Sequence, residues 1–264
     1  MTPDIIAFAH KLADASGEVI RPFFRQRIDI ANKPMMANGM AVFDPVTEAD
    51  RGAEKAMRAI IDRERPDDGI LGEEFGEKPG KNGLRWVLDP VDGTRAFING
   101  RHEWGSLIAL EKNLKPSLGI IDQPWLGERF IGVDGHAELH SRGTVAPLKV
   151  RACEKLSDAI LCATHPDAFF GEGEWAGFRR VQKQARLTRW GGDCYIFALM
   201  ALGFCDVIVE TTFKRWDVAA LIPVIEGAGG IITNWQGGSC TDGGQVLAAG
   251  DRRIHEAVVK LLNA

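Results

Sequence analysis

Two aspartates, Asp89 and Asp92, stand where an apolar run ends, in the segment WVLDPVDGT at residues 86–94. Two carboxylates held this close repel each other unless a cation lies between them. Carboxylate oxygens are hard ligands that suit Mg²⁺, which often binds a substrate phosphate at the same time. The Gly93-Thr94 step that follows could open a short helix and offer backbone N–H groups to a phosphate. A simple Asx turn at Asp92 and Gly93 is the alternative.

Two further acidic side chains occupy similar places in the sequence. Glu73 follows the apolar run ILG at residues 70–72, and Asp217 stands at the start of an apolar segment at 217–226. Glu73 as a solvated turn residue and Asp217 as a helix N-cap are the simpler interpretations. Four carboxylates that each lie at a strand end or a helix start nevertheless match a two-metal phosphoryl site.

Four segments, taken together and in order, resemble the signatures of the inositol monophosphatase superfamily. They are DPVTEAD at 44–50, GEE at 72–74, DPVDGT at 89–94 and WDVA at 216–219. The members of this superfamily are Mg²⁺-dependent, lithium-sensitive phosphomonoesterases. The resemblance implies a layered αβαβα fold, usually as a homodimer, and a small phosphate ester as substrate.

The resemblance also assigns metal ligands. Glu73, Asp89 and the carbonyl of Val91 would hold one Mg²⁺ ion. Asp89, Asp92 and Asp217 would hold a second, and Glu73 would orient a third, weaker ion through water. The expected cofactor is therefore two to three Mg²⁺ ions.

The catalytic residues follow from the same resemblance. Thr94 and Asp50 would orient and deprotonate the attacking water with help from Glu73, and the N–H groups of Gly93 and Thr94 would bind the phosphate. The spacing of Thr47 and Asp50 is also that of a capping box at a helix start. Both interpretations of Asp50 stay open at this point.

Substrate selectivity should come from groups that face the alcohol. By alignment with the family, Glu210 takes the place of a glutamate that binds a substrate hydroxyl. Asp193, beside Gly192, stands where inositol phosphatases usually carry a small uncharged residue. Two carboxylates on this side suit a cationic alcohol better than a neutral polyol. Trp190 could pack against a flat ring, and Asp193 could instead cap the helix that follows.

Three segments resemble the histidinol-phosphate phosphatases of this superfamily: WGGDCY at 190–195, GIIDQP at 119–124 and GER at 127–129. The predicted reaction is Mg²⁺-dependent hydrolysis of L-histidinol phosphate to L-histidinol and phosphate, a step of histidine biosynthesis. An inositol-1-monophosphatase and a broader sugar or nucleotide phosphatase are alternatives. A metal-binding regulatory protein without catalysis is a further alternative.

The helices and strands that must position these residues follow two different patterns along the chain. Apolar periodicity predicts a helix that opens at Pro3 and a second that begins near Thr47 and ends before Pro66. Short strands follow, at 69–72, 86–88, 106–110, 118–121 and 130–133. Later residues alternate strands (159–163, 206–209, 230–233, 246–249) with helices (173–184, 194–202, 217–226, 254–262).

The change in the order of predicted helices and strands near 147–156 predicts an α/β protein in two parts. Residues 1–148 would form an α+β metal-binding domain, and residues 149–264 an α/β substrate domain. Ligands would bind in the crevice between them, near the carboxyl ends of the strands.

Composition excludes several classes of protein. The chain has 264 residues, a formal net charge of -4, 45% hydrophobic and 26% charged residues, which rules out a disordered chain or a coiled coil. The sequence has no block of basic residues that would suit the binding of nucleic acid. No apolar run reaches the length of about 18 residues that a membrane span needs. The N-terminus does not resemble a signal peptide. Five cysteines without a CxxC pair indicate reduced thiols. A cytoplasmic protein is expected.

Overall fold

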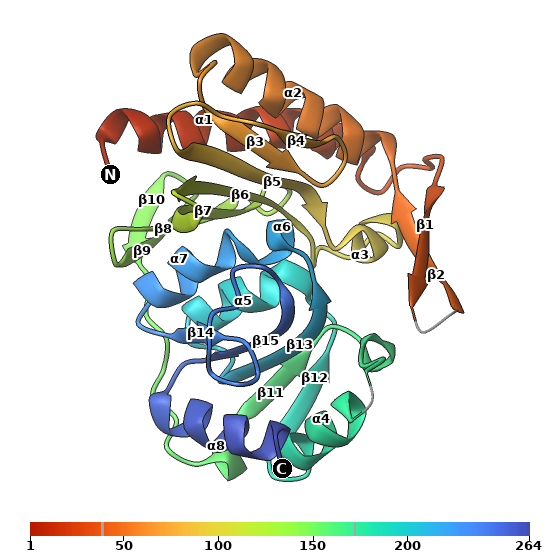
Figure 1. Ribbon diagram of the computed structural model, residues 1–264, viewed down its shortest axis with the longest axis vertical. Helices are drawn as coiled ribbons and strands as arrows, with labels where there is room; N and C mark the ends of the chain where they lie inside the picture. The colour runs from red at the N-terminus through yellow and green to blue at the C-terminus, as the bar shows by residue number, and fades with distance from the viewer. Residues whose placement is uncertain (38–39, 172) are drawn as a thin grey trace.

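The computed structural model describes residues 1–37, 40–171 and 173–264 (Figure 1). The side chains of residues 34–44 are outside what it describes, and these include Asp44 of the first motif. None of the described helices is both long and apolar enough to cross a membrane.

Five layers stack along the long axis of the molecule (Figure 1). The first layer holds α1 (Pro3–Ile20) and α2 (Glu48–Glu64), beside the hairpin of β1 (Ala31–Ala37) and β2 (Met40–Val46). The middle layer holds α5 (Asp193–Ala201), α6 (Arg215–Val218) and α7 (Leu221–Gly227), and the last holds α4 (Glu174–Gln182) and α8 (Arg252–Leu262). The predicted αβαβα α/β fold is confirmed.

The larger sheet lies between the first and middle helix layers, with the strand order β10-β9-β8-β7-β6-β5-β3-β4. Neighbouring strands are antiparallel except β3 and β5, which are parallel. The strands are β3 (Gly69–Gly72), β4 (Gly76–Lys78), β5 (Leu84–Asp92), β6 (Gly105–Lys112), β7 (Lys115–Gln123), β8 (Glu128–Val133), β9 (His136–Ser141) and β10 (Thr144–Pro147).

The smaller sheet has the order β12-β11-β13-β15-β14. Its strand β11 pairs in parallel with both β12 and β13, whereas β15 runs antiparallel to β13 and β14. The strands are β11 (Ile160–Ala163), β12 (Leu187–Trp190), β13 (Val207–Phe213), β14 (Ile231–Thr233) and β15 (Gly244–Ala249). The predicted alternation of strands and helices is therefore present, but the sheet is mixed.

Two glycines allow the middle helices to lie directly on the larger sheet. Gly119 and Gly132 are paired across β7 and β8. A Cβ atom on Gly119 would lie 2.0 Å from the carbonyl oxygen of Ala220, and one on Gly132 would lie 2.2 Å from the backbone of Pro223. Any larger residue would push α7 away from the sheet, so these positions fix the separation of the two layers.

One continuous core cluster joins the middle helices to both sheets. It includes Val87 and Leu107 of the larger sheet, Phe197 of α5, and Ile208 and Val246 of the smaller sheet. The larger sheet ends at Pro147, and β11 begins at Ile160. The division into residues 1–148 and 149–264 stays our proposal for the two folding units.

The helix predicted at 217–226 is two short helices, α6 and α7, with a break at Ala219 and Ala220. Pro223 lies in the first turn of α7, where its missing N–H leaves no helical hydrogen bond unmade. The break lets α6 turn its Asp217 toward the pocket described below, while α7 lies against the larger sheet.

Candidate functional site

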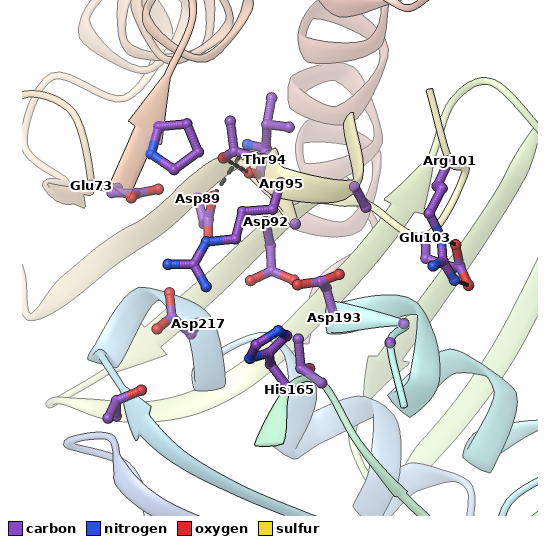
Figure 2. Close-up of a pocket in the computed structure, with 18 of the residues that line it drawn as sticks. Glu73, Asp89, Asp92, Thr94, Arg95, Arg101, Glu103, His165, Asp193 and Asp217 are labelled. Carbon is purple, nitrogen blue, oxygen red and sulfur yellow. Dashed lines mark hydrogen bonds and ion pairs between the residues drawn. The ribbon is translucent and has the colours of Figure 1, made fainter. Parts of the chain in front are cut away.

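A pocket of about 430 Å³ lies between the two halves of the chain, as the sequence predicts. Its walls come from Lys33, Pro45 and Glu73 and from residues within the segments 89–103, 164–165, 191–193 and 212–217. Figure 2 shows acidic side chains from both halves facing one another across it. The pocket is therefore the candidate active site.

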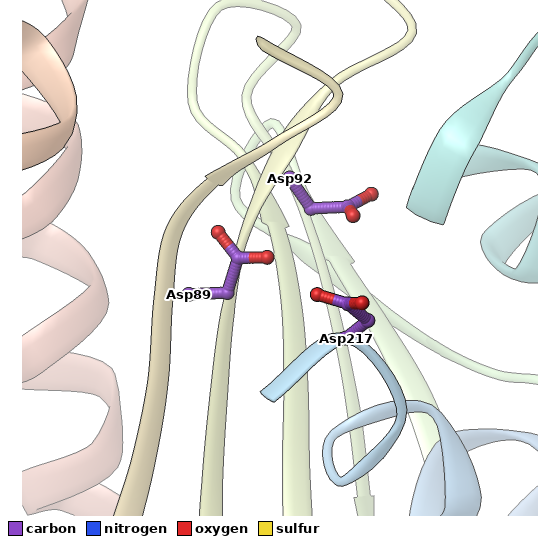
Figure 3. Close-up of side chains that lie close together, drawn as sticks. All are labelled: Asp89, Asp92 and Asp217. Carbon is purple, nitrogen blue, oxygen red and sulfur yellow. The ribbon is translucent and has the colours of Figure 1, made fainter. Parts of the chain in front are cut away.

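Three carboxylates converge at the base of this pocket (Figure 3). One oxygen from each of Asp89, Asp92 and Asp217 lies within 4.8 Å of the other two. Asp89 and Asp92 come from the end of β5, where the pairing with β6 shifts between them and turns both side chains to one side. Asp217 comes from α6 in the other half.

Backbone N–H groups fix the orientation of these carboxylates. The N–H of Val91 donates to Asp89 Oδ1 at 3.1 Å, and that of Cys194 donates to Asp92 Oδ2 at 2.6 Å. The N–H of Lys214 donates to Asp217 Oδ2 at 2.6 Å. Each carboxylate thus keeps one oxygen outside these bonds and available to a ligand.

Glu73 lies next to Asp89 because β3 runs parallel to β5 and its last residue, Gly72, pairs with Leu88. Its N–H donates to the carbonyl oxygen of Leu88, the residue before Asp89. Lys33 Nζ lies 2.8 Å from Glu73 Oε1 and also bonds to Glu74. Lys33 was not predicted from the sequence, because it lies 40 residues before Glu73 in a segment without a matching motif.

Burial and mutual repulsion dominate the electrostatics of the cluster. Burial raises the pKa of Asp89 well above its usual value, and the charges of Glu73, Asp92 and Asp217 raise it further. The pKa of Asp217 is raised in the same way, by burial and then by Asp92, and burial raises the pKa of Glu73 to about 7. Buried carboxylates that repel one another and offer hard oxygen atoms fit one or more Mg²⁺ ions.

Asp50 and Thr94 meet beside this cluster. Thr94 Oγ1 lies 3.3 Å from Asp50 Oδ1 and 3.0 Å from the carbonyl oxygen of Val91. The other oxygen of Asp50 accepts the N–H of Thr47 at 2.9 Å and also its hydroxyl, which forms the capping box of α2. Gly93 and Thr94 both line the pocket at the start of α3 (Thr94–Ile98).

Only some of the residues predicted to face the alcohol line the pocket. Gly192 and Asp193 line the pocket. Glu210 is buried behind the wall, where its Oε1 accepts the N–H of Thr164 at 2.6 Å and the Thr164 hydroxyl at 2.8 Å. Thr164, not Glu210, is the residue at the pocket surface.

Trp190 does not line the described pocket wall. Its ring centroid lies 5.0 Å from that of Phe178 and 6.4 Å from that of Trp175, in an aromatic cluster between the smaller sheet and α4. Side chains alternate along a strand, so Trp190 at the end of β12 points to the α4 side, while Gly191 and Gly192 bring the chain back to the pocket.

Asp193 is not the N-cap of α5. The helix begins at Asp193 itself, with Gly192 in the cap position, and the Asp193 side chain makes no capping hydrogen bond. Burial raises its pKa well above the usual value, and Asp92, Glu210 and Glu103 raise it further, whereas Arg95 acts in the opposite direction.

The pocket residues that were not identified from the sequence include Arg95, Arg101, Glu103 and His165. Arg101 Nε donates to Glu103 Oε2 at 2.6 Å at the rim of the pocket. Figure 2 places His165 beside Asp193 and shows Arg95 extending over the acidic base. The position of Arg95 directly after Thr94 was the one available signal, since the motif already placed Thr94 at the pocket.

Comparison with known proteins gives consistent matches over the whole chain. A sequence model described as the inositol monophosphatase family matches residues 2–264. The chain is 43% identical to the bifunctional phosphatase IMPL2, chloroplastic, of Arabidopsis thaliana, over 97% of this chain and 74% of that protein. It is 36% identical to a histidinol-phosphatase of Chlorobaculum parvum, over 94% and 93% of the two chains. A solved structure of an inositol monophosphatase from Zymomonas mobilis superimposes with a TM-score of 0.85, at 43% identity, over 99% and 98% of the chains.

Proposed function

Because the chain belongs to the inositol monophosphatase family, we propose that it is a Mg²⁺-dependent phosphomonoesterase that converts L-histidinol phosphate to L-histidinol and phosphate. The family is one of phosphatases that act on small phosphate esters. The choice of histidinol phosphate within it is supported by one observation above the others. That observation is the position of Asp193 in the wall of the pocket.

Asp193 lies in largely acidic surroundings. Asp92, Glu210 and Glu103 act on it unfavourably, and the positive charges of Arg95 and Arg101 offset this only in part. No hydrogen bond to its carboxylate is found among the described residues. A half-buried carboxylate in such surroundings is costly unless a cation joins it. The amine or imidazolium of histidinol phosphate would supply that cation, whereas the hydroxyls of a neutral polyol would not. The names of relatives such as the Chlorobaculum parvum histidinol-phosphatase agree with this choice.

The metal ligands that we propose are Glu73, Asp89, the carbonyl of Val91, Asp92 and Asp217. Bound Mg²⁺ would supply Lewis-acid stabilisation of the phosphate oxygens and would lower the pKa of a water molecule. Lys33 balances part of the charge of Glu73 and Glu74 beside this set. Gly93 and Thr94 are the proposed phosphate contacts, because both line the pocket next to Asp92.

Asp50 and Thr94 together can move one proton away from the nucleophile. The Thr94 hydroxyl can accept a proton from water only if it gives its own proton to a neighbouring acceptor. Asp50 Oδ1 is that acceptor at 3.3 Å, since Asp50 Oδ2 already binds Thr47. Burial raises the pKa of Asp50, which increases its affinity for the proton. Orientation and electrostatic stabilisation would supply most of the rate enhancement.

An assay of phosphate release tests this proposal. Purified protein is given histidinol phosphate with Mg²⁺ and then with EDTA, and we expect release only with the metal. Absence of turnover on any phosphomonoester would instead support a non-catalytic metal-binding protein.

Inositol 1-phosphate is the second candidate substrate. It is favoured by the match to the Zymomonas mobilis inositol monophosphatase, which is as high in identity as the match to the Arabidopsis phosphatase. Broader sugar or nucleotide phosphates remain in the same assay panel. We also propose a homodimer, lithium inhibition and a cytoplasmic location from the family resemblance alone, which sedimentation, inhibition kinetics and cell fractionation would test.

A further inference from the structure

One hydrogen bond joins two segments that are far apart in the sequence, 127–129 and 190–195. Tyr195 Oη donates to Glu128 Oε2 at 2.6 Å. Tyr195 lies in the first turn of α5, in the middle helix layer, whereas Glu128 is the first residue of β8 in the larger sheet. The bond therefore ties the start of a helix that lines the pocket to the other half of the chain.

Contacts other than this hydrogen bond also hold the Tyr195 ring in place. Its side chain is buried, and its edge-on neighbours are His102 at 6.0 Å and Phe130 at 6.3 Å between ring centroids. Phenylalanine would keep these ring contacts and lose only the hydroxyl. Tyr195 is also the single tyrosine of the chain, so a change there leaves no second phenol to confuse the result.

The first turn of α5 needs such a support. Gly192 and Asp193 have φ angles of 119° and 43°, and the left-handed region is unfavourable for a residue with a Cβ atom such as Asp193. A strained backbone of this kind persists only where surrounding contacts hold it in place. The Tyr195 hydroxyl is a contact two residues away that can do so.

Two functional groups depend on the position of this turn. The Cys194 N–H donates to Oδ2 of the proposed metal ligand Asp92 at 2.6 Å, and Asp193 lines the alcohol side of the pocket. We propose that Tyr195, through Glu128, is a positioning residue that fixes the first turn of α5 and thereby sets both Asp92 and Asp193. The proposal rests on the proposed function only for the identity of the ester.

Metal binding and kinetics of the Tyr195→Phe protein test this inference. Titration calorimetry with Mn²⁺ alone should show binding weakened by about three- to tenfold, the range expected for one lost hydrogen bond. The KM for histidinol phosphate should rise by a similar factor, with a smaller change in kcat. Glu128→Gln, which keeps an oxygen acceptor, should stay within about twofold of wild type, and Glu128→Ala should reproduce Tyr195→Phe. Combining Glu128→Ala with Tyr195→Phe should add little, because both remove the same bond.

Thr233→Val is the matched control for a general loss of stability. It removes two side-chain hydrogen bonds of similar length, at 2.7 Å to the carbonyl oxygen of Asn234 and at 2.8 Å with His255 Nε2, in the last layers of the fold. It should lower the melting temperature without changing the Mn²⁺ affinity or the KM. Unchanged Mn²⁺ affinity and KM in Tyr195→Phe would overturn the inference, and so would equal changes in Thr233→Val. If wild type fails on histidinol phosphate, the proposed function fails, while the Mn²⁺ titration still decides the role of Tyr195.

Discussion

Asp50 divides its carboxylate between a helix cap and the candidate active site. Its Oδ2 accepts the N–H of Thr47 at 2.9 Å, and its Oδ1 lies 3.3 Å from the hydroxyl of Thr94. The capping bonds hold Asp50 at the first turn of α2, and they leave one oxygen to face the pocket. The two roles that the sequence allowed for Asp50 are thus compatible in one side chain.

Thr94→Ala should lower kcat by about a hundredfold, at the low end of what a proton-transferring group contributes, and should change KM little. Steady-state kinetics with saturating Mg²⁺ give both constants. Thr94→Ser keeps the hydroxyl and should retain most of the activity. If Thr94→Ala alters KM alone, Thr94 binds the phosphate and takes no part in proton transfer.

Asp89→Asn should reduce activity by at least about a hundredfold at every Mg²⁺ concentration, because it removes a proposed ligand of both principal ions. The metal-free protein should melt at a higher temperature than wild type, since the change removes one charge from a buried group of four carboxylates. Calorimetric melting with EDTA and phosphate release with Mg²⁺ measure the two effects. Activity above about a tenth of wild type would contradict the role of Asp89 as a metal ligand.

Glu210→Gln should change the dependence of stability on pH. Burial raises the pKa of Glu210 to about 8 in the folded protein, against an unfolded value of about 4.3. The folded state therefore binds this proton more tightly, so its stabilising contribution is complete below about pH 4.3 and is lost as the pH rises through about 8. Glutamine carries no charge and keeps an oxygen for Thr164.

We therefore expect Glu210→Gln to gain stability relative to wild type between pH 5 and pH 9. Urea unfolding of the metal-free proteins at these two pH values measures the difference. The comparison with wild type cancels the contributions of His10 and His255, whose lowered pKa values act in the opposite sense. A difference that stays constant with pH would show that Glu210 does not titrate in this range.

Asp193→Ala should reduce kcat/KM for histidinol phosphate by about ten- to a hundredfold, the value of one hydrogen bond to a charged group. It should leave p-nitrophenyl phosphate within about threefold of wild type, because that ester offers no cation to Asp193. An equal loss on both esters would mean that Asp193 supports the pocket as a whole and does not select the alcohol.

The sequence predicted the layers and the cluster of carboxylates because both rest on local patterns. Apolar periodicity placed α1, α2 and most strands within a few residues, and the motifs at 72–74, 89–94 and 216–219 brought their carboxylates to one pocket. The strands β1, β2, β4, β9, β10 and β12 were not predicted. Of these, β4, β9, β10 and β12 are short and largely polar or exposed. Short polar strands of this kind carry little periodic signal.

The walls of the pocket were less predictable than its base. Alignment placed Trp190 and Glu210 near the substrate, but whether a side chain faces the pocket depends on strand alternation and on the neighbouring strand. Trp190 points into the aromatic cluster at α4, and Glu210 is covered by Thr164. Lys33 and His165 reach the pocket through contacts between distant segments, which no local pattern records.

The comparison of kcat/KM for histidinol phosphate and inositol 1-phosphate, on the wild-type protein with saturating Mg²⁺, tests the central claim most directly. We expect histidinol phosphate to be the better substrate by about tenfold or more, because its cationic groups pair with Asp193. An equal or higher kcat/KM for inositol 1-phosphate would contradict the account and would identify the protein as a phosphatase of neutral polyol esters.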